Sequence, residues 1–152
     1  MRLVVQRVTR AAVRSGDELL GEIGAGAMVL VGIGVEDTAE VVDRMADKLI
    51  GLRYFEDGEG RTNLAIADAG GAMLIVSQFT LYADLRRGRR PGFTTAALPE
   101  LANPLVDRFI GRVRDAGLTV ESGRFGAEMA VELVNDGPFT LVLDSEQDLS
   151  SG

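Results

Sequence analysis

The residues best suited to chemistry in this sequence lie in the stretch 77–84, which reads SQFTLYAD and follows the apolar run AMLIV. If the strand predicted by that run continues, Gln78 and Thr80 share one face, because side chains alternate along a strand. Ser77 and Phe79 then share the other face. Gln78 and Thr80 could face a pocket, with a backbone N–H near Phe79 directed at a developing oxyanion. A strand that emerges from the core into a loop produces the same pattern, so both interpretations stay open.

Two residue types that carry much of enzyme chemistry are missing, because the sequence contains no histidine and no cysteine. A Ser-His-Asp triad, an imidazole base, a thiolate nucleophile and metal sites built on these residues are therefore excluded. Any catalysis must depend on hydroxyls, carboxylates, amides, backbone groups or the substrate itself. We expect no metal ion and no other cofactor.

Four arginines, Arg86, Arg87, Arg89 and Arg90, lie close together in a segment without acidic residues. The chain as a whole is acidic, with a formal net charge of -7 and only 16 lysines and arginines. A run of charges is usually a solvated loop. The planar fork of arginine also suits phosphate oxygens, so a phosphate-containing partner is the alternative to a solvated loop.

The segment 135–138, NDGP, combines the Asp-Gly hairpin signal with a proline where a second strand should begin. We expect a turn between two strands here. A trans peptide bond between Gly137 and Pro138 is the commoner arrangement, and a cis bond, which proline permits, is the alternative.

The elements that must position these segments are mostly strands. Alternating apolar residues and a turn signal at 15–17 predict a hairpin that ends near Ile23. A short apolar run between glycines predicts a central strand at 27–31. A turn at 57–60 could join two short strands. Further strands are expected at 72–81, 118–120, 129–134 and 139–143.

Two amphipathic helices are predicted by apolar residues that recur at steps of three and four. The first helix has Asp37 or Thr38 as its N-cap and acidic residues near its N-terminus. The second helix could begin at Asn103-Pro104 or at Pro99, and it ends at Gly117.

Length and composition indicate a single domain, because 152 residues with 46% hydrophobic content can build one core. We expect an α/β domain of about seven strands and two helices, with a mainly antiparallel or mixed sheet. It would span residues 1–145, with a polar, frayed tail at 146–152. No apolar run approaches the roughly 20 residues that cross a bilayer, and the first residues lack a signal-peptide block. A soluble, cytoplasmic protein without membrane contact is therefore expected.

Five segments together resemble the D-aminoacyl-tRNA deacylases, also known as the D-tyrosyl-tRNA deacylase family. They are QRV at 6–8, SQFTL at 77–81, GRRP at 88–91, GRFGA at 123–127 and NDGPFT at 135–140. Their order and spacing resemble the family from residue 1 to about residue 144. Two positions depart from the family pattern. Phe139 stands where valine usually follows Gly-Pro, and Gly92 stands where serine is usual after Arg-Arg-Pro.

The resemblance implies a homodimeric hydrolase with a deacylase-type fold and tRNA as its partner. Such enzymes cleave the ester that joins a D-amino acid, or glycine mischarged on the alanine tRNA, to the terminal adenosine, which is a form of translational proofreading. The implied catalytic residues are Ser77, Gln78, Phe79 and Thr80. Gly137 and Pro138 would form the family's cis dipeptide, which reaches into the partner's pocket and excludes L side chains. The arginines at 86–90 would then contact tRNA.

Two mechanisms are compatible with the residues available. Thr80 could attack the ester, but its only polar neighbour in the motif is the neutral amide of Gln78, which is no base. Alternatively, backbone N–H groups around Phe79 stabilise the oxyanion while the 2′-hydroxyl of the substrate helps to activate water. We prefer the second mechanism.

Two other functions stay open. One is a related editing deacylase with a trans Gly-Pro bond and different chiral selectivity. The other is a non-catalytic tRNA-binding module built around the arginines at 86–90.

Overall fold

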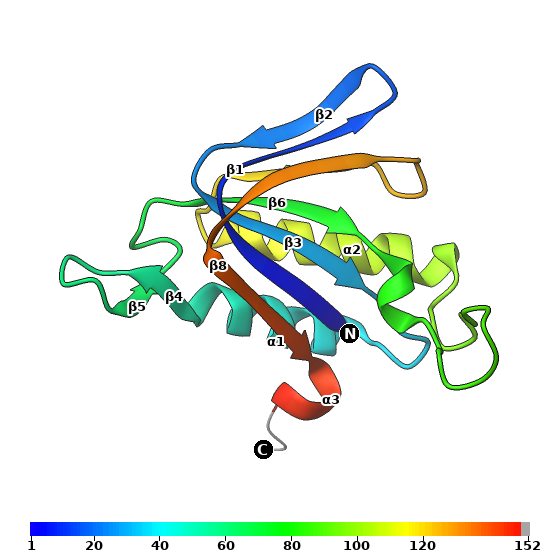
Figure 1. The fold of residues 1–152 in the computed structure, drawn as a ribbon. Coiled ribbons are helices and arrows are strands. Elements are labelled where there is room, and N and C mark those ends of the chain that lie inside the picture. The colour runs from blue at the N-terminus through cyan, green and yellow to red at the C-terminus, as the bar shows by residue number, and fades with distance from the viewer. Residues whose placement is uncertain (150–152) are drawn as a thin grey trace.

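The computed structural model describes residues 1–149, which form a mixed sheet, a small two-stranded sheet and a layer of two long helices (Figure 1). The strands are β1 (Arg2–Ser15), β2 (Glu18–Ile23), β3 (Gly26–Gly32), β4 (Arg53–Glu56), β5 (Thr62–Ala65), β6 (Ala72–Ser77), β7 (Val120–Ser122) and β8 (Ala130–Asp144). The helices are α1 (Ala39–Gly51), the 3-10 helix η1 (Phe79–Tyr82), α2 (Pro99–Asp115) and the short α3 (Ser145–Asp148). The expected α/β fold with a mixed sheet is confirmed.

Strand β1 organises the six-stranded sheet because it pairs with three other strands. Its first half is antiparallel to β3, and its second half is antiparallel to β2, as the predicted hairpin requires. Strand β8 runs antiparallel along the other edge of β1. On the far side of β3, β6 and then β7 add in parallel. The sheet is therefore antiparallel on one side and parallel on the other.

The sheet curls so that β2 lies over β6 and β7. A side chain at Gly21 of β2 would place its Cβ 3.1 Å from the Cβ of Glu121 and 3.3 Å from Leu74 Cδ1, so the strands approach too closely for a bulky residue. A second hydrophobic cluster fills the space inside the curl. It contains Val8, Ala11, Val13, Ile23, Met28, Leu74 and Val76.

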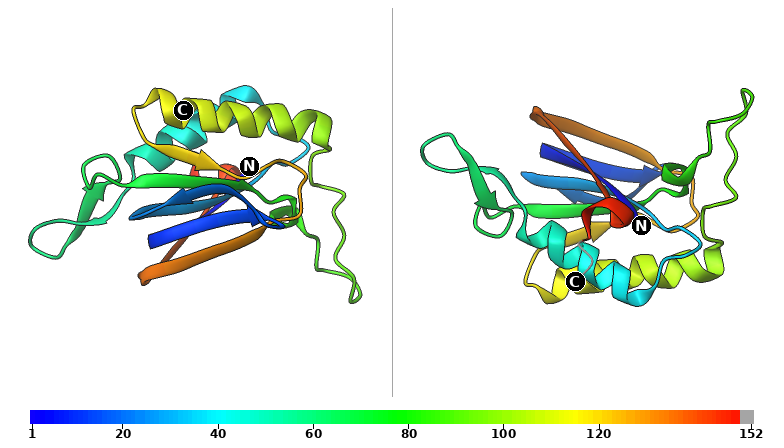
Figure 2. Two further views of the ribbon diagram at one scale, coloured as in Figure 1. Left: turned by 90° about the horizontal axis from the view of Figure 1, so that it is seen from above. Right: turned by 90° about the horizontal axis from the view of Figure 1, so that it is seen from below.

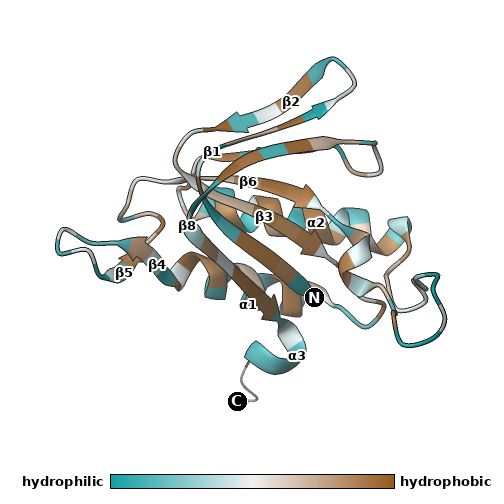
Figure 3. Ribbon diagram, viewed as in Figure 1, coloured by the Kyte–Doolittle hydropathy of each residue, from teal (hydrophilic) through white to brown (hydrophobic). Residues whose placement is uncertain are grey.

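The main core lies between the sheet and the two long helices, which cover the same face of the sheet (Figure 2). Thr38 caps α1, since its hydroxyl oxygen accepts a hydrogen bond from the backbone N–H of Val41. Apolar positions of both helices face the sheet, as the hydropathy colouring shows (Figure 3). Helix α2 begins at Pro99, one of the two predicted starts, and Pro104 lies inside it. None of the described helices is long and apolar enough to span a bilayer.

The expected strand at 72–81 is too long. Strand β6 ends at Ser77, because Gln78 makes the last bond to β3, from its backbone N–H to the carbonyl of Val31 (2.7 Å), and β3 itself ends at Gly32. The chain then turns into η1, with the N–H of Leu81 bonded to the carbonyl of Gln78 at 3.3 Å. The simple alternation of faces beyond Ser77 was therefore wrong.

The expected hairpin at 135–138 is also wrong. The two halves of β8 do not pair with each other, because both pair with β1 in one continuous strand. Gln6 lies opposite Thr140 and Val8 lies opposite Asn135, so the segment 136–139 bulges out opposite Arg7. The Asp-Gly signal marks a bulge in a long strand here and not a chain reversal.

The polar tail is more ordered at its start than the sequence predicted. Residues Ser145–Asp148 form α3, and the Asp144 side chain caps it by accepting a hydrogen bond from the N–H of Glu146. The Met1 ammonium donates to Ser145 Oγ (2.7 Å) and to Asp37 Oδ1 (2.6 Å), which fastens α3 beside the start of β1. The remainder of the expected tail, residues 150–152, lies outside the described residues.

Candidate active site

A cavity of about 560 Å³ opens beside the end of β6, between the sheet and the start of α2. The wall is supplied by the ends of β3 and β6, the start of η1, the segment that leads into α2, the first turns of α2, the loop before β8 and the first residues of β8. The lining residues are Val31, Ile33, Val76, Ser77, Gln78, Phe79, Phe93, Ala96, Ala97, Leu98, Pro99, Ala102, Val106, Phe125, Gly126, Ala127, Met129 and Val131. Nearly all of these side chains are apolar.

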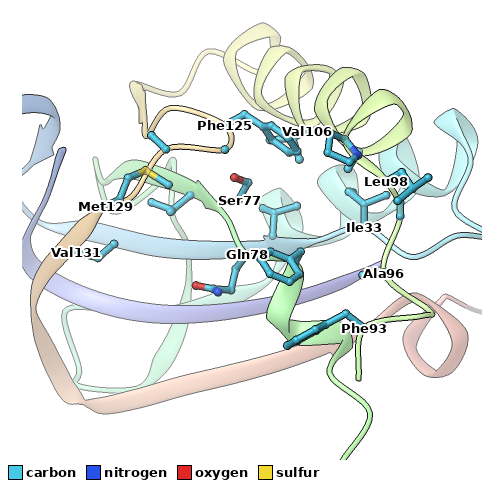
Figure 4. A pocket seen from close by; sticks show the side chains of 18 residues that line it. Ile33, Ser77, Gln78, Phe93, Ala96, Leu98, Val106, Phe125, Met129 and Val131 are labelled. Carbon is cyan, nitrogen blue, oxygen red and sulfur yellow. The ribbon is translucent and has the colours of Figure 1, made fainter. Parts of the chain in front are cut away.

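The polar side chains in this wall are those of Ser77 and Gln78 (Figure 4). Ser77 lies below Phe125 in this view, and Gln78 lies between Ser77 and the rim residue Phe93. No aspartate, glutamate, lysine or arginine among residues 1–149 lines the cavity. The cavity therefore offers a hydroxyl and an amide but no side chain that could act as a strong base or acid at neutral pH.

The 3-10 helix η1 determines where the rest of the SQFT motif lies. Phe79 lines the cavity, but Thr80 does not. The Gln78 amide Nε2 donates a hydrogen bond to Thr80 Oγ1, so one lone pair of that hydroxyl is already used. The backbone N–H groups of Phe79 and Thr80 make no hydrogen bond within the described part of the chain. Two unpaired donors therefore lie next to the cavity wall.

An aromatic pair forms the outer rim of the cavity. Phe79 is 57% exposed and Phe93 is 37% exposed, and their ring centroids lie 5.0 Å apart in an edge-to-face arrangement. Contiguous exposed apolar surface often marks a binding site, and a nucleobase can stack on such a pair of rings.

Gly137 and Pro138 lie outside this cavity in the isolated chain. Both residues are exposed at the bulge of β8, and the peptide bond between them is cis. The side chain of Asn135 closes the bulge. Its Nδ2 donates to the carbonyls of Arg7 and Phe139, both at 2.9 Å, and its Oδ1 accepts from the N–H of Phe139 at 3.1 Å.

Arg7 supports the bulge from below and is almost fully buried. Its Nη1 donates to the carbonyl of Tyr54 (2.9 Å), and its Nε donates to the carbonyl of Asp136 (3.1 Å). The guanidinium also lies 4.7 Å from the centre of the Phe139 ring, a cation–π distance. The larger residue at 139 is accommodated because its ring packs between Arg7 and Tyr54.

The arginines at 86–90 lie in an exposed loop next to the cavity rim and contribute nothing to its lining. Asp84 and Gly92 close the base of this loop through two backbone hydrogen bonds of 2.7 and 3.0 Å. Arg86 is the member of the group that is paired, since it forms a bidentate salt bridge with Asp84.

Within residues 1–149, no group of three or more acidic side chains is arranged to hold a metal ion. Asp84, the acidic residue closest in sequence to the motif, is engaged by Arg86, and Asp37 is engaged by the Met1 ammonium. The candidate site is therefore built from an apolar wall, two polar side chains and backbone donors.

This arrangement can be compared with known proteins. A family described as D-Tyr-tRNA(Tyr) deacylase matches residues 4–144. The chain belongs to this family. A D-aminoacyl-tRNA deacylase of Symbiobacterium thermophilum is 58% identical over 147 residues, which cover 97% of each chain. A relative with the same name from Roseiflexus sp. is 57% identical and covers 95% of this chain and 94% of its own. The deacylases of this family are hydrolases, so the chain is a hydrolytic enzyme.

Two solved structures share the fold. The protein named c-Myc DNA Unwinding Element Binding Protein is 40% identical and superposes with a TM-score of 0.89, over 95% of this chain and 98% of its own. A probable eukaryotic D-amino acid tRNA deacylase is 21% identical, with a TM-score of 0.82 over 93% of this chain and 97% of its own. The second likeness bears on the fold alone.

Sequence reasoning assigned only Ser77, Gln78 and Phe79 of the 18 lining residues to the site and missed most of the cavity wall. Phe125, Gly126 and Ala127 carried the family resemblance, but no role followed from it. Phe93 and the start of α2 gave no signal beyond ordinary apolar periodicity. Their position depends on how the segment after Gly92 returns to the sheet, where the N–H of Ala97 bonds to the carbonyl of Ile33 at 2.9 Å.

Proposed function

We propose that this protein hydrolyses the ester bond of D-aminoacyl-tRNA and of glycyl-tRNA mischarged on the alanine tRNA, releasing the free amino acid and tRNA. The observation that carries this proposal is the cavity at the SQFT motif in a chain of the deacylase family. The cavity is large enough for an aminoacyl group. Its mouth bears exposed aromatic rings beside the loop that carries the arginines at 86–90. This activity would serve translational proofreading in the cytoplasm.

The chemistry proposed needs no protein base. An aminoacyl ester is already reactive, so the site has to hold it still and stabilise the negative charge that develops on its carbonyl oxygen. The unpaired N–H groups of Phe79 and Thr80 are the candidate donors. One such donor is typically worth about 10²–10³ in rate. The 2′-hydroxyl of the terminal ribose would assist the attacking water.

The polar side chains of the cavity would orient the substrate. Ser77 and Gln78 are the hydrogen-bonding side chains of the wall, and the substrate offers an α-amino group and ribose hydroxyls as partners. The Thr80 side chain would act only by holding the Gln78 amide in place. Of the four proposed catalytic residues, Thr80 is thus assigned a backbone donor and a side chain with an indirect role.

Chiral selection is proposed to come from a second copy of the chain. Gly137 and Pro138 are exposed and lie outside the cavity of their own protomer. We propose that they enter the cavity of a partner in a homodimer, where they occupy the space that an L side chain needs. The exposed apolar residues Val134 and Val142 of β8, a strand with a free edge, support an interface on this side.

The deciding experiment is a deacylation assay with D-tyrosyl-tRNA, L-tyrosyl-tRNA and glycyl-tRNA. The quantity measured is the release of the labelled amino acid. We expect rapid loss of the D-tyrosyl and glycyl esters and no acceleration for the L-tyrosyl ester. Equal cleavage of both tyrosyl esters would indicate an editing deacylase without chiral selection. Binding of tRNA without any turnover would instead support a nucleic-acid-binding module, the function that the name of one 40% identical relative suggests.

The dimer is tested separately. Sedimentation of the 16.2 kDa chain should give twice the monomer mass at micromolar concentration. A strictly monomeric and active enzyme would contradict the cross-subunit position of Gly137 and Pro138.

A further inference from the structure

The loop at residues 85–91, here called the arginine loop, projects from one end of the molecule (Figure 2). Its base is closed by the backbone pairing of Asp84 with Gly92, and all seven of its residues are exposed. Gly88 has a φ of +67°, a left-handed conformation that suits glycine at the turn of the loop. The arginines are therefore presented outward from a fixed base.

The four arginines are not equivalent. Arg86 donates from Nε to Asp84 Oδ1 (2.9 Å) and from Nη2 to Asp84 Oδ2 (2.8 Å), and its backbone N–H donates to Oδ1 as well (3.1 Å). These bonds to Arg86 lower the pKa of the Asp84 carboxyl to about 2, so the carboxylate stays charged at any useful pH. The charge of Arg86 is thereby largely offset.

Arg87, Arg89 and Arg90 have no such partner. None of them forms an ion pair or a hydrogen bond within residues 1–149, and all three are exposed. The net negative charge of the chain as a whole repels polyanions. Three unpaired cations on one loop oppose this locally and attract phosphate groups to the loop. They are spread along an exposed loop and do not line the cavity. Such a row of cations suits successive phosphates of a polymer better than one small anion.

The loop starts and ends at the rim of the cavity. Gly92 is followed directly by Phe93, and Asp84 follows η1, which carries Phe79. The two phenylalanine rings touch across the rim, so both ends of the loop are tied to the cavity mouth. About three residues of chain on each arm give the loop a reach of roughly 10 Å, at about 3.3–3.6 Å per residue. Nucleotides that precede a terminal residue at the mouth can therefore come within reach of the loop.

We propose that the arginine loop binds the backbone phosphates of the nucleotides just before the acylated end of the RNA. The phosphate ligands are Arg87, Arg89 and Arg90. Arg86 is not a phosphate ligand because its guanidinium is paired with Asp84, whose backbone also closes the base of the loop. The inference rests on the proposed function, because that function places the acylated terminal nucleotide at the cavity. The loop supplies affinity and register and takes no part in the ester chemistry.

The test compares two substrates that differ only in their phosphates. D-tyrosyl-tRNA carries the upstream backbone, and D-tyrosyl-adenosine does not. The variant Arg87→Ala/Arg89→Ala/Arg90→Ala should raise the KM for D-tyrosyl-tRNA by at least about 10-fold and leave kcat within about 3-fold, since phosphate contacts bind substrate and transition state alike. Its kcat/KM for D-tyrosyl-adenosine should match that of the unsubstituted protein. An unchanged KM for D-tyrosyl-tRNA would overturn the inference.

The salt dependence gives a second and independent readout. Each phosphate contact adds about 0.7–0.9 to the slope of log K against log salt concentration. We therefore expect the salt-dependence slope of the triple variant to be shallower by about two units, measured with tRNA that carries no amino acid. Arg86→Ala should leave the slope nearly unchanged, and Asp84→Asn, which frees Arg86, should steepen it by about one unit. Equal effects of Arg86→Ala and the other arginine substitutions would contradict the division of roles.

The matched control is Arg53→Ala/Arg61→Ala, which removes exposed positive charges on β4 and the turn before β5, at the opposite end of the molecule (Figure 1). For each charge removed, this control should change the slope of log K against log salt concentration far less than the triple variant does. Failure of the proposed function is recognised separately, because the unsubstituted protein would then cleave neither substrate. The tRNA-binding slopes would still support or overturn the loop assignment in that case.

Discussion

Gln78 and Thr80 are joined by a hydrogen bond in which the Gln78 amide Nε2 is the donor and the Thr80 hydroxyl oxygen is the acceptor. The amide cannot remove a proton from the hydroxyl, because its nitrogen is itself the donor. No other base lines the cavity among the described residues. The Thr80 hydroxyl, which the motif first suggests as a nucleophile, thus holds the Gln78 side chain in place.

Thr80→Ala is therefore expected to keep most of the deacylase activity, with a loss of kcat/KM of less than about 30-fold, or roughly 2 kcal/mol. Single-turnover release of tyrosine from D-tyrosyl-tRNA measures this. Thr80→Ser, which keeps the acceptor oxygen, is the matched variant and should resemble the unsubstituted protein. A loss of four or more orders of magnitude in Thr80→Ala alone would establish a nucleophilic hydroxyl.

The pH dependence of the reaction should follow the substrate and not the protein. Because no titratable side chain of residues 1–149 lines the cavity, the ratio of the enzymatic rate to the spontaneous hydrolysis rate of the same ester should stay nearly constant between about pH 6 and 8.5. Comparing the two rates on one substrate cancels the titration of its own α-amino group. A bell-shaped ratio would reveal a protein acid or base that reaches the ester.

Gly137→Ala should weaken chiral selection. Gly137 has a φ of +139°, and an added Cβ would lie 2.9 Å from the N of Phe139 and 3.2 Å from Arg7 Nη2, so the bulge must shift. We expect the ratio of D-tyrosyl to L-tyrosyl cleavage to fall by at least about 10-fold, equivalent to about 1.4 kcal/mol. Gly16→Ala is the control, because Gly16 also has a positive φ but lies in open space. Equal ratios of D-tyrosyl to L-tyrosyl cleavage in both variants would show that the bulge does not determine chiral selection.

Tyr54→Phe should stabilise the protein. The Tyr54 hydroxyl is buried and has no hydrogen-bond partner in the described structure, and burial raises the pKa of this phenol. Removing an unsatisfied buried hydroxyl should raise the free energy of unfolding by about 1 kcal/mol, measured by urea denaturation at fixed protein concentration. Tyr54→Leu should instead destabilise, because the ring packs on Phe55 and Phe139. A destabilised Tyr54→Phe variant would mean that the hydroxyl has a partner.

The contact between α1 and α2 should depend on pH on the acid side. Hydrogen bonds from Arg108 and Arg112 lower the pKa values of Asp43 and Asp47, respectively, below the usual 3.8. A carboxyl whose pKa is lowered by folding adds stability above its unfolded pKa and loses it as the pH falls through the folded value. Asp43→Asn/Asp47→Asn should therefore lower the urea midpoint slightly at pH 7. The difference should vanish once the pH has fallen below the lowered pKa values of the folded protein. A difference that persists there would show that the ion pairs are not its cause.

Local chemistry made several features predictable. The absence of histidine and cysteine removed most catalytic mechanisms before any fold was considered. The N-cap at Thr38, the buried face of α1 and the existence of the apolar strand β3 follow from periodicity and capping, which depend on neighbours within a few residues. The sequence motif singles out Ser77, Gln78 and Phe79, and the structure brings all three to one cavity.

Tertiary structure alone decided the features that depend on distant partners. Whether residues 135–138 reverse the chain or bulge depended on β1, since Asn135 bonds to a carbonyl 128 residues away in the sequence. The end of β6 depended on the length of β3, and this turned Thr80 away from the wall that Gln78 lines. The arginines were visible as a charge cluster, but only the fold separated the paired Arg86 from the others. Sequence determines which groups are available, and long-range pairing determines which of them meet.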